Sequence, residues 1–109
     1  MSIKLVRDAI RESPGFIRCS SDQWRPVRDE AEHAALLLKK IHEELGELLE
    51  AVASGDEAGI RLEGCDLLEV LTCFIHVRTG ATPGQIARGI EKKQLERGGF
   101  YGGLVWDHP

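Results

Sequence analysis

One interruption in a long helical pattern constrains the fold of this chain most. Between residues 27 and 54 apolar side chains recur every three or four positions, and the same spacing returns over residues 57–78. Ser54-Gly55-Asp56 stands between the two stretches. Glycine suits the position just after a helix, and aspartate suits the N-cap of the next one. The sequence therefore predicts helices at 27–54 and 57–78 that fold back on each other as an antiparallel hairpin.

A third helix follows at 83–97, where Thr82 suits the N-cap and Pro83 suits the first helical position. Residues 1–26 are expected to form an N-terminal arm, and residues 98–109 form a glycine-rich tail without helical period. The fold class is therefore all-α, an antiparallel helical hairpin plus a third helix. Three helices leave apolar faces uncovered, so we expect a homodimer or homotetramer to complete a four-helix-type bundle.

Length and composition narrow the classes of protein. The 109 residues, 1–109, are enough for a single domain. A net charge of −4, from 14 basic and 18 acidic residues, argues against nucleic acid as the main partner. No apolar run approaches the roughly 18 residues needed to span a bilayer, and no apolar segment of a signal peptide is present. Three cysteines without a C-x-x-C pair suit a reducing compartment. We expect a cytoplasmic protein that binds neither nucleic acid nor a membrane.

Two pairs of carboxylates stand in register about Gly55. Glu44 and Glu47 are three residues apart, and so are Glu63 and Asp66, so each pair shares a helix face. Glu47 lies eight positions before Gly55 and Glu63 eight positions after it. Glu44 lies eleven positions before Gly55 and Asp66 eleven positions after it. At about 1.5 Å of rise per residue, the hairpin brings all four to matching heights. The spacing predicts a cluster of four carboxylates.

A cluster of this kind needs a counter-charge, because four neighbouring carboxylates repel one another. Lysines are scarce beside them in the sequence, so we expect a metal ion. Oxygen ligands favour Mg²⁺, Mn²⁺ or Ca²⁺ over Zn²⁺. A single E-x-x-E pair is common on solvated helix faces. The hypothesis of a metal site therefore depends on the register of the two pairs.

The same residues resemble the hallmark of the MazG-like, all-α nucleoside triphosphate pyrophosphohydrolase superfamily, here Glu43-Glu44-Leu-Gly-Glu47 and Glu63-Gly-Cys-Asp66. Two further segments resemble the subgroup related to phosphoribosyl-ATP pyrophosphohydrolase, namely Lys4-Leu-Val-Arg7-Asp8 and Lys92-Lys93-Gln-Leu-Glu-Arg97-Gly-Gly-Phe100. The resemblance implies an enzyme that depends on Mg²⁺ and hydrolyses a nucleoside triphosphate to the monophosphate and pyrophosphate.

The resemblance also implies roles for individual residues. The metal ligands would be Glu44, Glu47, Glu63 and Asp66. Glu43 and Glu44 would be the catalytic residues, with Glu43 either a support or the base that activates water.

Basic residues are expected to hold the phosphates. The candidates are Lys93, Arg97, Arg7 and Lys4. Lys93 and Arg97 share a face at the end of the third helix, where compensation of the helix dipole is the competing role. For Arg7 a structural ion pair is the competing role. A base pocket could draw on Trp24, Phe100 and Tyr101.

The resemblance says less about which substrate the enzyme hydrolyses. The 12–35 region and the short glycine-rich tail depart from a typical histidine-biosynthesis enzyme, so we prefer a house-cleaning hydrolase of non-standard or surplus nucleoside triphosphates. Hydrolysis of phosphoribosyl-ATP is one alternative. A non-catalytic helical dimer module with a structural metal site is an alternative of another class.

Overall fold

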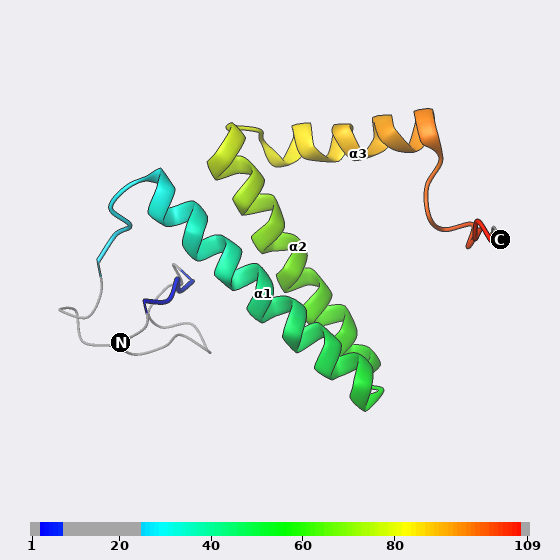
Figure 1. The fold of residues 1–109 in the computed structure, drawn as a ribbon, viewed down its shortest axis with the longest axis horizontal. Helices are drawn as coiled ribbons and strands as arrows, with labels where there is room; N and C mark the ends of the chain where they lie inside the picture. Colours follow the sequence, from blue (N-terminus) through cyan, green and yellow to red (C-terminus); the bar gives the residue numbers. More distant parts are fainter. Residues whose placement is uncertain (1–2, 8–24, 108–109) are drawn as a thin grey trace.

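Three helices make up the fold. The computed structural model describes residues 3–7 and 25–107, and within these ranges it contains helices and no strand. The elements are α1 (Glu30–Ser54), α2 (Glu57–Thr79) and α3 (Pro83–Arg97) (Figure 1). The all-α prediction is confirmed. The helix ends agree with the sequence to within one residue, except at the start of α1.

Helix α1 begins three residues later than predicted, because Asp29 caps it. The Asp29 side chain accepts a hydrogen bond from the backbone N–H of Glu32 at 2.8 Å, which satisfies one of the unpaired donors of the first turn. Pro26, Val27 and Arg28 precede the cap and are not helical. The apolar spacing predicted a start at residue 27, but the Asp29 cap sets the start at Glu30.

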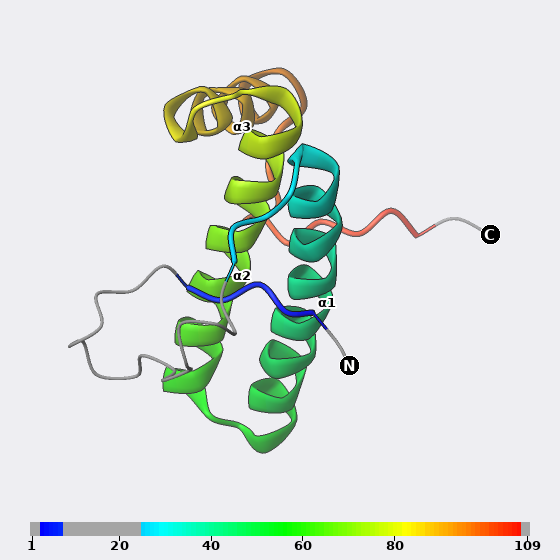
Figure 2. The same cartoon turned by 90° about the vertical axis from the view of Figure 1, so that its left-hand side faces the viewer.

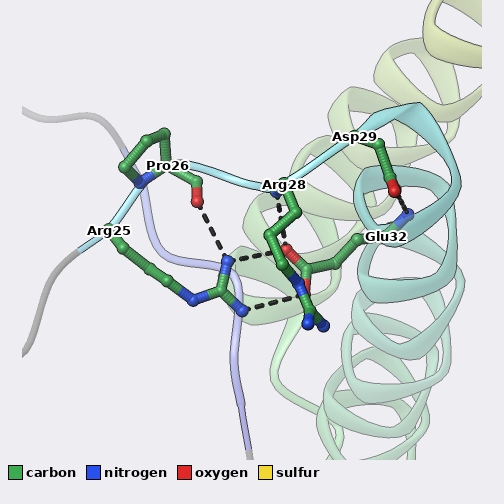
Figure 3. A network of polar contacts seen from close by, with 5 residues as sticks. All are labelled: Arg25, Pro26, Arg28, Asp29 and Glu32. Carbon is green, nitrogen blue, oxygen red and sulfur yellow. Dashed lines mark hydrogen bonds and ion pairs between the residues drawn. The ribbon is translucent and has the colours of Figure 1, made fainter.

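Two arginines converge on one carboxylate beside this cap (Figure 3). Arg25 donates to both oxygens of Glu32 at 2.7 and 2.8 Å, and Arg28 donates through its side chain at 2.7 Å and through its backbone N–H at 2.9 Å. The hydrogen bond from Arg25, followed by those from Arg28, holds the pKa of Glu32 far below its usual range. This network ties the segment before α1 to its first turn.

The turn between α1 and α2 has the predicted form. Gly55 adopts a left-handed conformation with φ of 68°, which residues with a side chain rarely adopt. The Asp56 side chain accepts a hydrogen bond from the backbone N–H of Gly59 at 3.0 Å and caps α2. The two helices therefore reverse direction within two residues and lie side by side (Figures 1 and 2).

The packing between α1 and α2 buries few side chains. The buried apolar residues among those described are Ala34, Leu37, Ala51 and Val70. Much of the apolar stripe on the hairpin stays exposed: Leu38, Leu45, Leu49, Val52, Leu62, Leu68, Leu71 and Ile75. The single chain thus leaves an extended apolar surface in contact with solvent.

Helix α3 leaves the hairpin at its open end. Thr82 and Gln85 form a reciprocal capping box, and Pro83 occupies the first turn, as predicted. The helix contacts α2 but not α1, projects away from the hairpin (Figure 1), and has no buried residue. Across the described residues, no helix is long and apolar enough to cross a membrane.

Residues 3–7 form an extended segment that crosses the hairpin (Figure 2). We call it the N-terminal arm from here on. Lys39 of α1 donates a hydrogen bond to the backbone carbonyl of Ile3 at 3.3 Å. The arm therefore lies against the hairpin, near the middle of both helices.

Candidate metal centre

Three carboxylates from two helices meet in the hairpin. Glu44 of α1 and Glu63 and Asp66 of α2 each offer an oxygen atom, and these three atoms all lie within 4.8 Å of one another. Glu63 and Asp66 share a face because they are three residues apart on α2. The tight turn at Gly55 brings Glu44 to their height. We call these three residues the carboxylate cluster.

The cluster is partly shielded from water. Glu44 is only 5% exposed, and Glu63 and Asp66 are half-buried. Glu44 Oε2 and Glu63 Oε2 are buried and have no hydrogen-bond partner in the described part of the chain. A buried acceptor without a partner costs roughly 1–3 kcal/mol, and more when it is charged. A bound cation would satisfy both oxygens, so this all-oxygen donor set fits a divalent cation such as Mg²⁺.

The electrostatics of Glu44 agree with that fit. Burial raises the pKa of the Glu44 carboxyl, and the neighbouring Glu47 and Asp66 raise it further, while Lys40 opposes them. Negative charge is thus destabilised at this position by its own surroundings. A divalent cation would remove much of that cost.

Glu47 stands apart from the other three predicted ligands. Its side chain is exposed, and it is not among the three residues whose oxygens converge. Its charge still acts on Glu44, one turn earlier on α1. Glu47 thus lies beside Glu44, as the heights along the hairpin predict, but outside the group of three whose oxygens all lie within 4.8 Å of one another.

The expectation that few lysines lie nearby is wrong. Lys40 Nζ lies 3.5 Å from Glu44 Oε1 and 3.4 Å from Glu43 Oε2. The signal was present in the sequence, because Lys40 precedes Glu44 by four residues on the same helix. One ammonium group serves both glutamates and does not reach the two buried oxygens without partners. A divalent cation therefore remains compatible with the cluster.

The N-terminal arm brings further positive charge to the cluster. Arg7 Nη2 donates to Asp66 Oδ1 at 2.9 Å, and Arg7 Nη1 donates to Glu69 Oε1 at 2.6 Å. Lys4 Nζ lies 3.8 Å from Glu43 Oε2. The hydrogen bond to Glu69 is the largest cause of a raised Arg7 pKa. Sequence reasoning missed Glu69, which could have been found because it follows Asp66 by three residues on α2.

The other predicted residues lie away from the cluster or outside the described residues. Lys93 and Arg97 belong to α3, which does not contact α1. Phe100 and Tyr101 are fully exposed, so the described residues 3–7 and 25–107 do not enclose them in a base pocket. Trp24 and Asp8 lie outside the described residues.

Comparison with known protein families gives one match. Residues 32–98 match the model of the MazG nucleotide pyrophosphohydrolase domain. This range holds all three residues of the carboxylate cluster and excludes the N-terminal arm. The family resemblance is confirmed, whereas the subgroup related to phosphoribosyl-ATP pyrophosphohydrolase stays a prediction. No curated protein and no solved structure matches the chain.

Proposed function

The chain belongs to the MazG nucleotide pyrophosphohydrolase domain family, and we propose that it hydrolyses a nucleoside triphosphate to the monophosphate and pyrophosphate in the presence of Mg²⁺. In this reaction water adds to the α-phosphorus, the bond between the α-phosphorus and the bridging oxygen breaks, and pyrophosphate leaves. The observation that carries the proposal is the convergence of Glu44, Glu63 and Asp66, together with the buried oxygens of Glu44 and Glu63 that have no partner in the described part of the chain.

The carboxylate cluster would hold the metal ion. Glu44, Glu63 and Asp66 would be its ligands, and Glu47 would join them from one turn further along α1. The ion would supply the positive charge that offsets the triphosphate and the leaving pyrophosphate. The partial burial of the cluster would strengthen the electrostatic interactions of a bound cation.

Cationic side chains of this chain would hold the phosphates that the metal does not cover. We propose Arg7 and Lys4 of the N-terminal arm for this role, and their ion pairs with Asp66 and Glu43 support it. The contacts of Glu43 with Lys4 and Lys40 favour a supporting role for Glu43 over that of a base. Lys93 and Arg97 could serve a site only on another copy of the chain, given the direction of α3.

The substrate class we propose is a non-standard or surplus nucleoside triphosphate. The test is release of pyrophosphate and of the monophosphate from a panel of canonical and modified triphosphates and phosphoribosyl-ATP, with and without Mg²⁺. We expect turnover of at least one modified triphosphate only with Mg²⁺. No release from any compound would overturn the proposal and favour a non-catalytic helical module.

The ligand assignment has its own test. Glu63→Gln removes one charge from the cluster with almost no change in volume, so we expect kcat/KM to fall by at least about a hundredfold. Glu50→Gln, an exposed glutamate of α1 outside the cluster, is the matched control and should keep the wild-type rate. Circular dichroism checks that both variants stay helical. A near-normal rate for Glu63→Gln would show that the ligand set is wrong.

A further inference from the structure

Arg7 is bound by two carboxylates, of which only one belongs to the carboxylate cluster. Asp66 belongs to the carboxylate cluster, whereas Glu69 lies outside it and its side chain is 60% exposed. The two acceptors are three residues apart on α2, so one guanidinium reaches both. The bond from Nη1 to Glu69 is the shorter of the two, 2.6 Å against 2.9 Å from Nη2 to Asp66.

The two bonds respond differently to a cation in the cluster. A divalent cation that binds Asp66 draws on the same negative charge that holds Arg7 Nη2, so that bond weakens. The bond to Glu69 keeps its full acceptor, because Glu69 is not among the residues that converge. Arg7 would then stay beside the site through Nη1, while Nη2 becomes available to a phosphate oxygen.

We propose that Glu69 is a positioning residue that holds Arg7 and the N-terminal arm at the carboxylate cluster, so that the guanidinium meets the phosphate chain of the nucleotide. This inference rests on the proposed function for its phosphate contact, but the anchoring of the arm does not depend on it. The other contacts of the arm are weaker in kind: Lys4 faces Glu43 at 3.8 Å, and Lys39 donates to the carbonyl of Ile3 at 3.3 Å. Among the polar contacts between the arm and the hairpin in the described part of the chain, the one with Glu69 is the shortest.

Limited trypsin digestion measures the anchoring without any substrate. Trypsin must take the arginine side chain into its own specificity pocket, and a guanidinium that is bound to two carboxylates is less available for this. We expect Glu69→Gln to be cleaved after Arg7 about two- to fivefold faster than the wild type, the range for loss of one exposed ion pair. Mass spectrometry follows the fragment that begins at Asp8.

Glu30→Gln is the matched control, because the Glu30 side chain is also 60% exposed and also faces one arginine, Arg78. It should be cleaved after Arg7 at the wild-type rate. Glu69→Asp keeps the charge on a shorter side chain and should restore part of the protection. If Glu69→Gln were cleaved no faster than the control, Glu69 would not anchor the arm.

Kinetics then separate positioning from mere structure. With the triphosphate that is turned over best, we expect Glu69→Gln to raise KM about three- to tenfold and to change kcat less, because the lost contact acts on bound phosphate. Glu69→Asp should recover part of the KM. An unchanged KM alongside faster cleavage would overturn the phosphate role. Absence of turnover in the wild type would overturn the proposed function, and the digestion would still decide whether Glu69 anchors Arg7.

Discussion

At the scale of residues, the carboxylate cluster places function in conflict with stability. Glu44 is buried next to two other carboxylates and keeps an oxygen without a hydrogen bond in the described part of the chain. Lys40 offsets some of this charge at 3.5 Å. The remaining repulsion lowers the stability of the fold, and such destabilisation is common where side chains must bind a metal ion or a substrate.

Neutralising Glu44 should therefore stabilise the protein without metal. We expect Glu44→Gln to raise the free energy of unfolding by about 1 kcal/mol in EDTA at neutral pH, because repulsion within the cluster falls while Lys40 keeps Glu43 as a partner. Thermal unfolding measures the change. Added Mg²⁺ should raise the Tm of the wild type and leave that of the variant nearly unchanged. A lower Tm for the variant in EDTA would contradict the prediction.

At the scale of elements, caps and turns decide where each helix begins and ends. Gly55 ends α1, Asp56 starts α2 and Thr82 starts α3, as the sequence indicates, and Gln85 completes a capping box with Thr82. At the start of α1, two arginines converge on Glu32 next to the Asp29 cap (Figure 3). This network of hydrogen bonds and ion pairs ties the residues before α1 to its first turn.

The network should give stability a dependence on pH. The pKa of Glu32 is lowered in the folded protein, so its ion pairs stabilise the fold fully above the unfolded pKa, near 4.3 for glutamate. Their contribution falls as the pH drops below that value toward the lower folded pKa. We expect Glu32→Gln to lower the Tm by a constant amount between roughly pH 6 and pH 8. The difference in Tm between the wild type and the variant should narrow below about pH 4.

Measurement of Tm against pH for both proteins tests this. Glu50→Gln serves as the reference, because the pH dependence of its Tm should follow that of the wild type. If the difference in Tm between the wild type and Glu32→Gln widened toward acid pH, the lowered pKa of Glu32 would be contradicted.

At the scale of the whole molecule, the chain is more open than a compact domain of its length. Its radius of gyration is 17.4 Å, against about 13 Å for a compact domain of similar length. The exposed apolar residues of the hairpin lie on both helices, and α3 buries no residue. These features support the expectation of a homodimer or homotetramer, in which a second hairpin covers this surface.

Mass measurement by light scattering tests the assembly. We expect at least twice the 12.1 kDa of one chain at micromolar concentration. Leu49 is 57% exposed on α1, and Leu49→Glu should shift the equilibrium toward the monomer by placing a charge in the contact. Leu104→Glu, in the tail where Leu104 is 97% exposed, should have a smaller effect. A monomeric wild type would refute the prediction.

The fold was largely predictable from sequence, because helical period, glycine and capping residues act locally. Part of the cluster was predictable for the same reason, since counting from Gly55 gives the height of each carboxylate. Glu47 shows the limit, because equal height brings it beside Glu44 but does not decide which carboxylate oxygens converge. Arg7 and Glu69 show another, because their pairing depends on the path of the N-terminal arm. No local pattern sets that path.

The pairing of Arg7 with Glu69 also affects the order in which the molecule forms. These residues are 62 positions apart in the chain, whereas the hairpin joins helices that are neighbours in sequence. Closing a long loop costs more entropy than closing a short one, so we expect the local hairpin to form first and the arm to dock afterwards. During synthesis the arm emerges first but has no partner until α2 has followed. The carboxylate cluster would therefore form before Arg7 pairs with Asp66 and Glu69.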